Sequence, residues 1–269
     1  MTVATELEQH LLRAEGHALH YVATGDPSGE LVVLLHPAFG DHRCFAGQLG
    51  ALAERYRVVA VDMLGHGRSQ VEDAQGGVAD TGGLVAALIA REGRGRAHLV
   101  GVSLGSLIAQ DVAARFPEVV RSLTVVGGYP IAGVDKALRR AQLVEMLTWL
   151  PLMLVSMRLF RRYVARKAAW TSAAREQFER SAQLFTRRSF RAMAGLDRIM
   201  RPGPQSQRQP LQIVVGEHEL PPVRRAAEDW HRREPDSLLR IIPDAGHCAN
   251  MDNPAVFNAH LLAFLEGVG

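Results

Sequence analysis

Short apolar runs that alternate with helical segments constrain the fold of this chain more than any other feature. Seven runs are predicted as strands, at residues 18–23, 31–35, 57–61, 98–102, 122–126, 211–215 and 238–242. Five segments are predicted as helices, at residues 44–54, 78–91, 104–115, 223–233 and 254–265. Most runs are continuous rather than alternating, as a sheet covered on both faces requires. The pattern predicts an α/β protein with a doubly wound, mostly parallel sheet that binds ligands at the carboxyl ends of its strands.

The alternation stops between the runs that end at residue 126 and begin at residue 211. A glycine pair and a turn open this stretch, and basic helices fill it. The segment 202–210 closes it, because its three prolines cannot continue a helix. We therefore expect a helical cap inserted between two strands of a core domain. The expected bounds are 1–128 and 205–269 for the core, and 129–204 for the cap.

Charge sets the expected cap apart from the rest of the chain. Residues 134–201 hold 15 Lys and Arg but only 5 Asp and Glu, whereas the whole chain has a net charge of +3. One interpretation is that its helices bury an apolar face on the core while the arginines reach water. A second is a lipophilic acyl-chain pocket roofed by Leu and Met side chains. A third is contact with an anionic group or surface, such as a phospholipid membrane or an acyl-carrier partner.

Composition narrows the class of protein. Apolar residues form 47% of the chain, enough for a large core, and the two cysteines form no disulfide framework. The polar, acidic N-terminus does not resemble a signal peptide, and no apolar stretch reaches about 18 residues. We expect a cytoplasmic protein. Nucleic-acid binding is not expected, because no aromatic platform accompanies the basic residues. The oligomeric state stays open.

Ser103 is the candidate nucleophile. It is the centre of Gly-Val-Ser-Leu-Gly at residues 101–105, between a predicted strand and a predicted helix. A sharp strand-to-helix turn of this kind projects a serine hydroxyl beyond the sheet edge. The flanking glycines allow the tight turn and a close approach of helix and strand. The alternative is a structural serine in an ordinary βα turn.

A serine needs a base, and the base needs a carboxylate to orient it. His247 follows the last predicted strand, at the same sheet edge as Ser103, and is the candidate base. Glu219 lies in the loop after the strand at 211–215 and is the candidate acid. Glu217 is its competitor in the same loop. Either glutamate can also be an ordinary solvated loop residue.

An oxyanion needs two N–H donors. Leu104 supplies one, because it follows the nucleophile at the start of the helix. The loop after residue 35 supplies the other, with Ala38 as first candidate and Phe39 as second; Pro37 has no N–H. The substrate pocket is predicted at His36, Met146, Trp149 and Met153. No metal site is predicted, because no cysteine or carboxylate cluster adjoins His17 or His20 in the sequence.

Together these motifs resemble the α/β-hydrolase superfamily over nearly the whole chain. The matching segments are His-Pro-Ala-Phe-Gly at 36–40, Asp-Met-Leu-Gly-His-Gly-Arg-Ser at 62–69, Gly-Val-Ser-Leu-Gly at 101–105, residues 216–219, and Gly-His at 246–247. The order Ser103, Glu219, His247 is similar to the family's order of nucleophile, acid and base. The resemblance implies a mostly parallel eight-stranded sheet and a cofactor-free enzyme.

Two departures from the family pattern matter. Members often have His-Gly where this chain has His36 and Pro37, and their acid is more commonly Asp than Glu. The family tolerates glutamate, and some N-acyl homoserine lactone hydrolases of this fold use it. Because the nucleophile is serine, the resemblance disfavours haloalkane dehalogenases and epoxide hydrolases, whose members of this family use aspartate.

The first functional hypothesis is a serine hydrolase that cleaves a carboxylic ester, lactone or thioester of a small acyl substrate through an acyl-enzyme. A second is an acyltransferase, or a biosynthetic enzyme that performs cyclisation or C–C cleavage on the same fold. A third is a ligand receptor or interaction module with little turnover. The fold alone does not distinguish them, because it hosts many reactions.

Overall fold

We analysed a computed structural model of the chain. It describes residues 7–73, 75–92, 95–132, 136–193, 195–200 and 208–268, and within these it gives the backbone alone at 136–139 and 141–143. The predicted closing segment at 202–210 lies largely outside the described residues, as does the end of the predicted opening turn.

The described strands form one mixed sheet. Their bounds are β1 (Glu8–Ala14), β2 (His17–Thr24), β3 (Leu31–Leu35), β4 (Arg57–Val61), β5 (Gln70–Val71), β6 (Ala97–Val102), β7 (Val120–Val126), β8 (Leu211–Gly216) and β9 (Leu238–Ile242). The order across the sheet is β1-β2-β4-β3-β6-β7-β8-β9, with β5 pairing β2 at the side. The pairs from β4 to β9 are parallel, and β2 is antiparallel to β1, β4 and β5. The predicted fold class, a mostly parallel sheet of about eight strands, is confirmed.

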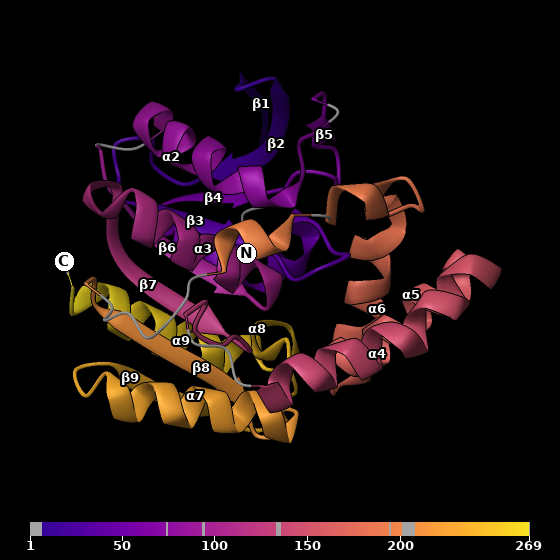
Figure 1. The fold of residues 1–269 in the computed structure, drawn as a ribbon. Coiled ribbons are helices and arrows are strands. Elements are labelled where there is room, and N and C mark those ends of the chain that lie inside the picture. The colour runs from indigo at the N-terminus through magenta and orange to yellow at the C-terminus, as the bar shows by residue number, and fades with distance from the viewer. Residues whose placement is uncertain are drawn as a thin grey trace.

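The helices lie on both faces of this sheet (Figure 1). Their bounds are α1 (Ala46–Ala53), α2 (Thr81–Glu92), α3 (Leu104–Arg115), α4 (Lys136–Val155), α5 (Met157–Ala168), α6 (Ser172–Ser181), α7 (Pro221–Arg233), α8 (Ala249–Asp252) and α9 (Pro254–Glu266). Short 3₁₀ turns are η1 (His42–Phe45), η2 (Val78–Asp80), η3 (Pro117–Val119), η4 (Ala182–Leu184), η5 (Ser189–Met193) and η6 (Leu196–Ile199). Helices α2, α3 and α7 share one apolar core with the sheet, and α1 and α9 share the other.

Burial explains why the central strands read as continuous apolar runs. Every residue of β3, β4, β6 and β8 is buried, because helices cover both faces of the sheet there. The edge strand β1 instead alternates between exposed and half-buried residues. It pairs with β2 through a tight turn in which Glu15 and Gly16 both have positive φ, at 52° and 72°.

Residues 136–193 and 195–200, which we call the helical insertion, lie between β7 and β8 in the chain and contain α4, α5 and α6. In Figure 1 these helices extend beyond the sheet on the side where α4 is labelled. Helices α5 and α6 begin with side-chain caps, because Ser156 accepts from the N–H of Leu159 and Thr171 accepts from that of Ala174. None of the described helices combines the length and the apolarity needed to span a bilayer.

Candidate active site

Ser103 occupies a strained turn between β6 and α3. Its φ and ψ are 51° and −114°, a conformation that a residue with a side chain rarely adopts. The turn is held because the Ser103 N–H donates to the Val126 carbonyl on β7 at 2.8 Å. Strain of this kind persists only where the surrounding structure enforces it, as it does at strand-to-helix nucleophile turns.

The two glycines that flank Ser103 allow the helix to touch the sheet. A Cβ at Gly101 would lie 2.4 Å from the Gly105 carbonyl oxygen. One at Gly105 would lie 2.1 Å from the Leu35 carbonyl oxygen and 2.7 Å from that of His36. The spacing of the motif therefore follows from contact between the first turn of α3 and the ends of β3 and β6. That contact also places the first N–H groups of α3 beside the loop that follows β3.

The structure brings together Ser103, His247 and Glu219, which are far apart in the chain. His247 Nε2 lies 2.8 Å from Ser103 Oγ. His247 Nδ1 lies 3.0 Å from both carboxylate oxygens of Glu219. Each side chain stands on a loop or turn that follows a strand of the parallel sheet, so the topology gathers all three at one sheet edge.

The proton positions along this hydrogen-bond chain follow from the carboxylate of Glu219, which can only accept. A carboxylate only accepts hydrogen bonds, so His247 donates its Nδ1 proton to Glu219 and its Nε2 accepts the Ser103 hydroxyl. Burial by itself lowers the pKa of His247, but the charge of Glu219 and its hydrogen bond outweigh burial and raise that pKa. The Glu219 side chain is fully buried, and one of its oxygens also accepts from the Leu220 N–H at 2.8 Å. His247 is thus a strengthened base in a fixed orientation.

Glu217, the alternative acid, points elsewhere. Its side chain is exposed, and one carboxylate oxygen accepts from the Asp244 N–H at 3.1 Å. Its backbone N–H donates to the Ile242 carbonyl, so the residue continues the pairing between the ends of β8 and β9. The geometry favours Glu219 over Glu217 as the partner of His247.

The three candidate oxyanion donors lie where β3 and α3 meet. Leu104 is the first residue of α3, so its N–H has no partner within the helix. Phe39 has a positive φ of 71°, in a turn closed by a hydrogen bond from the Gly40 N–H to the Pro37 carbonyl. Among the described residues, no protein acceptor is seen for the N–H groups of Ala38, Phe39 or Leu104. These groups are therefore available to a ligand oxygen.

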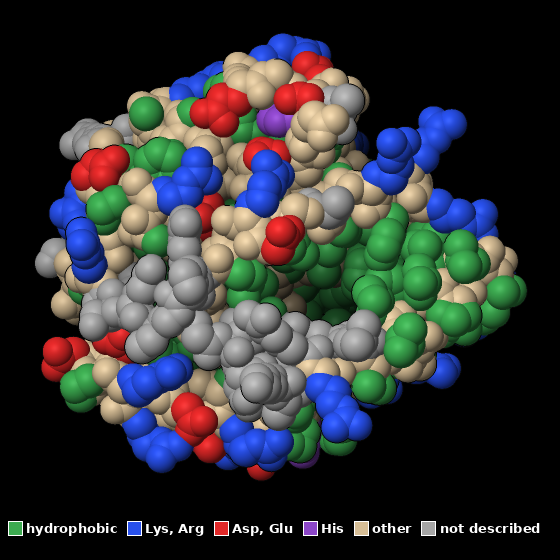
Figure 2. Space-filling model, in the orientation of Figure 1, with side chains coloured by type: hydrophobic (Ala, Val, Ile, Leu, Met, Phe, Trp, Pro, Cys, Tyr) green, Lys and Arg blue, Asp and Glu red, His purple; other side chains and the backbone are tan. Residues whose placement is uncertain are grey.

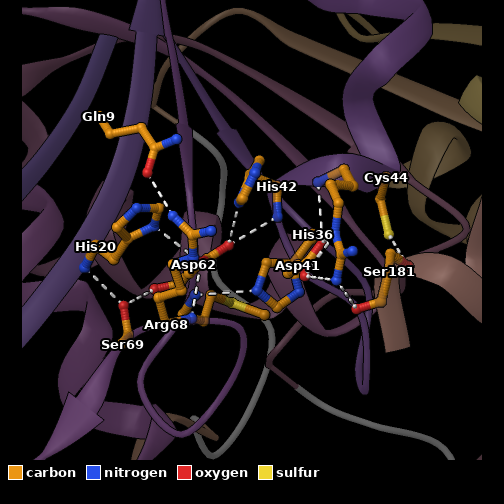
Figure 3. A network of polar contacts seen from close by, with 12 residues as sticks. Gln9, His20, His36, Asp41, His42, Cys44, Asp62, Arg68, Ser69 and Ser181 are labelled. Carbon is orange, nitrogen blue, oxygen red and sulfur yellow. Dashed lines mark hydrogen bonds and ion pairs between the residues drawn. The ribbon is translucent and has the colours of Figure 1, made fainter. Parts of the chain in front are cut away.

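His36 braces the loop that carries Ala38. It is fully buried, its Nδ1 donates to the Pro37 carbonyl at 2.8 Å, and its Nε2 accepts from the Met63 N–H at 3.0 Å (Figure 3). Both ring nitrogens are satisfied by backbone groups. The predicted pocket role of His36 does not fit this placement, because the ring has no polar atom left for a substrate.

Asp62 forms a hydrogen-bond hub that sequence reasoning missed (Figure 3). Its carboxylate is fully buried. One oxygen accepts from the His42 N–H and His42 Nδ1, both at 2.8 Å, and the other from His20 Nδ1 and the Arg68 N–H, both at 2.9 Å. Burial alone would raise the pKa of Asp62, but the hydrogen bonds from the two histidines lower it well below its usual value. The hub ties the loop after β3 to the loop after β4.

The same contacts correct the expectation that no carboxylate lies near His20. Ligand atoms of His20, His42 and Asp62 lie within 4.8 Å of one another, the grouping that a metal ion would need. Sequence reasoning missed this contact because Asp62 is 42 residues from His20 and reaches it only through the antiparallel pairing of β2 and β4. Every contact is a hydrogen bond of ordinary length, and two of the donors are backbone N–H groups, so the carboxylate is saturated without a metal.

An aromatic cluster links the loop after β3 to the helical insertion. The Phe39 ring lies 5.1–5.6 Å from the rings of Trp149, Phe160 and Phe185, in edge-to-face contacts. Trp149 also contacts Phe190 at 5.1 Å. Figure 2 shows a hollow lined by hydrophobic side chains between the core and the insertion. A ligand in this hollow would lie against apolar surface.

The predicted pocket residues of α4, Met146, Trp149 and Met153, are three and four residues apart and therefore share one face of that helix. Met153 is buried and Trp149 is half-buried against Phe39, whereas Met146, nearer the start of the helix, is 37% exposed. Trp149 and Met153 therefore lie on the side of α4 that faces the core. The pocket role of Met146 stays a prediction.

Asp252 ties the loop that carries His247 to the helical insertion. Its carboxylate accepts from the Gly246 N–H at 2.9 Å, from the Trp170 N–H at 2.9 Å and from the Thr171 N–H at 2.7 Å. The Thr171 hydroxyl donates to the same carboxylate at 3.0 Å. The Asp252 carboxylate therefore joins Gly246, the residue before the candidate base, to the junction of α5 and α6.

Comparisons with known proteins agree with this architecture. The family model described as "Alpha/beta hydrolase family" matches residues 32–260. The dihydrolipoyllysine-residue acetyltransferase component of the acetoin cleaving system of Pseudomonas putida is 26% identical over 268 residues, which cover 93% of this chain and 67% of that protein. A Variovorax paradoxus protein provisionally named carbamate hydrolase RutD is 29% identical over 272 residues, covering 93% of this chain and 97% of that protein.

Solved structures share the fold. A thermophilic esterase from Thermogutta terrifontis aligns with a TM-score of 0.79 at 21% identity, covering 98% of this chain and 99% of its own. A carboxylesterase structure from the thaumarchaeon Nitrososphaera gargenis aligns with a TM-score of 0.80 at 19% identity, covering 96% and 98% of the two chains. At such low identity these matches establish the common fold.

Proposed function

Because this chain belongs to the alpha/beta hydrolase family, whose model spans residues 32–260, we propose that it is a serine hydrolase that cleaves a carboxylic ester, lactone or thioester. The observation that carries the proposal is the continuous hydrogen-bond chain from Ser103 through His247 to a fully buried Glu219. Family membership and the esterase neighbours support hydrolase activity in general. The ester chemistry and the roles of the three residues are the proposed part.

Acylation uses the geometry as it stands. Ser103 Oγ attacks the acyl carbon while His247 Nε2 accepts the hydroxyl proton. The resulting imidazolium is stabilised by the buried carboxylate of Glu219, which its Nδ1–H already faces. Two backbone N–H groups, from Leu104 and Ala38, hold the negative oxygen that develops on the substrate. His247 then gives its proton to the departing alcohol or thiol.

Deacylation repeats the proton transfers with water. His247 accepts a proton from the attacking water, and the tetrahedral intermediate collapses to release the acid and regenerate Ser103. The hollow lined by hydrophobic side chains in Figure 2 favours a lipophilic acyl group, since contact with such side chains removes apolar surface from water.

Acyl transfer is the second candidate function. The relative in Pseudomonas putida is named as an acetyltransferase component, and an acyl-enzyme can pass its acyl group to an alcohol instead of water. The carbamate named for the Variovorax paradoxus relative extends the candidate bond from C–O esters to N-linked acyl groups. Both variants of the chemistry use the same first step at Ser103.

A fluorophosphonate probe and p-nitrophenyl esters of graded chain length test the proposal. Ser103→Ala is expected to abolish probe labelling and to reduce ester turnover more than about a thousandfold, because the nucleophile is removed. Ser172→Ala, an exposed serine in the first turn of α6, is the matched control and keeps both activities. Full labelling or turnover in Ser103→Ala would show that another residue reacts. Added alcohols, with analysis of the products, separate hydrolysis from acyl transfer.

A further inference from the structure

Helix α4 exposes an apolar stripe that a helix in a protein core would bury. The stripe consists of Val144, Leu147, Pro151, Leu154 and Val155, whose spacing of three and four residues places them on one helical face. Four of these side chains are 56–77% exposed. Scattered exposed apolar residues are ordinary, but a continuous stripe of them marks an interaction surface.

The next helix, α5, which packs against α4, carries exposed arginines. Arg158, Arg162 and Arg166 recur every four residues along α5, so they share one face of that helix, and all three are exposed. Within the part of the chain that the structure describes, none of the three forms an ion pair with a carboxylate. Their charges are therefore unneutralised beside the stripe. We call the apolar stripe and these three arginines the docking face.

We propose that the docking face binds the surface of a bilayer that contains anionic lipids. Aliphatic side chains beside arginines match the two layers of such a surface, because the former enter the acyl boundary and the latter contact phosphate groups. Residues 134–201 carry 15 basic against 5 acidic residues, so the surrounding field has the same sign. Since no described helix is long and apolar enough to span a bilayer, the binding is peripheral.

Other occupants fit the docking face less well. A second copy in a two-fold dimer would bring the same arginines of both subunits together without counter-charges. A nucleic acid would match the arginines but leave the aliphatic stripe in water. An anionic bilayer satisfies both parts of the face at once. Figure 2 shows hydrophobic side chains gathered over α4 and α5 next to the apolar hollow.

The docking face lies on the opposite side of α4 from the candidate site. On this helix Trp149 and Met153 face the core, whereas Leu147 and Leu154 face solvent. Membrane binding through this face does not depend on the proposed function.

Vesicle sedimentation of the full-length Ser103→Ala variant tests the inference without turnover. We expect binding to phosphatidylcholine vesicles that contain about 30% phosphatidylglycerol, weakening with added salt, and little binding to phosphatidylcholine alone. The double variant Arg158→Glu/Arg162→Glu should lower the partition coefficient at least about 25-fold, since each basic residue near such a surface contributes about a fivefold factor. Leu147→Ser/Leu154→Ser should also weaken binding, because the stripe loses its apolar contact.

A matched control has the same change in net charge away from the docking face. Arg96→Glu/Arg233→Glu alters two exposed arginines that precede β6 and β9, at the sheet edge opposite the carboxyl ends of the strands. Its vesicle binding should stay within about threefold, because screening confines the effect of surface charges to about 8 Å. Circular dichroism confirms that each variant folds.

Three results would overturn the inference: no binding to anionic vesicles at low salt, an equal loss in the control variant, or a dimer in solution that Leu147→Ser/Leu154→Ser dissociates. Turnover of a water-soluble ester by the wild-type chain is measured in parallel. If that turnover is absent while vesicle binding follows the expected pattern, the proposed function fails and the docking inference stands. If turnover is present and vesicle binding is absent, the reverse holds.

Discussion

Replacing Asp62 with asparagine tests whether the buried hub holds the candidate site together. Each carboxylate oxygen accepts from one backbone N–H and one imidazole: His42 N–H and Nδ1 on one side, Arg68 N–H and His20 Nδ1 on the other. Asparagine replaces one oxygen by an NH₂ group. An imidazole can change its tautomer to accept from that group, but a backbone N–H cannot. In either amide orientation, one backbone N–H therefore loses its acceptor.

The expected loss of stability follows from this count. An unsatisfied buried N–H costs about 1–3 kcal/mol, and the remaining bonds weaken because their acceptor is no longer charged. Asp62→Asn should thus lower the free energy of unfolding by about 2–4 kcal/mol. For a chain of this size the thermal midpoint should fall by roughly 5–15 °C.

The pH dependence gives a second, signed test of the same variant. The pKa of Asp62 is lowered in the folded chain, so its charge stabilises the fold above the unfolded-state pKa, which is about 4. The stability difference between wild type and Asp62→Asn should be constant above about pH 5. It should shrink as the pH falls below about 4, because the carboxyl group of the unfolded wild-type chain then takes up a proton while the folded chain keeps Asp62 charged.

Urea denaturation followed by circular dichroism, at several pH values, measures both effects. Asp236→Asn, an exposed aspartate between α7 and β9, is the control and should change the stability by less than about 0.5 kcal/mol. If Asp62→Asn matches the control at pH 7, the hub does not stabilise the fold and the reasoning is refuted. A difference that grows on acidification would refute the assigned direction of the pKa shift.

The remaining predictions concern the triad and the nucleophile turn. Glu219→Gln should reduce kcat about 10³–10⁴-fold, whereas Glu217→Gln should keep it within about threefold, and steady-state kinetics on one ester would show a loss in both if the assignment were wrong. Because Glu219 raises the pKa of His247, wild-type activity should fall as the pH drops through that pKa. The residual activity of Glu219→Gln should persist to a lower pH, because His247 then protonates at a lower pH. Gly105→Ala places a Cβ 2.1 Å from a backbone carbonyl oxygen of β3 and should cost at least about 2 kcal/mol in urea denaturation, whereas Gly267→Ala, with its nearest atom at 3.5 Å, should not.

The sequence predicted the central sheet well because buried parallel strands are continuous apolar runs. The runs at 31–35 and 57–61 coincide with the buried strands β3 and β4, and the run at 211–215 covers all but the last residue of β8. Strand β1 was missed, because half of its residues face solvent and its alternation is weak. Strand β5 was missed because two residues are too few to give a pattern, and its pairing with β2 depends on the tertiary fold.

The candidate triad was predictable because the chain order of a doubly wound sheet places its loops. Ser103, Glu219 and His247 each follow a strand whose carboxyl end lies at the same edge. The Asp62 hub was not predictable in this way. It depends on which side chains of β2 and the loop after β3 turn towards one carboxylate, and no local pattern of residues records that choice.

The hydrogen bonds of Asp252 hold the α5–α6 junction of the helical insertion to the core. Any rotation that lifts the junction at Trp170 and Thr171 away from the core must break three hydrogen bonds to Asp252 or drag Gly246, and the adjacent His247, with it. A displacement of this junction would therefore either shift the loop that carries His247, the candidate base, or break the bonds to Asp252.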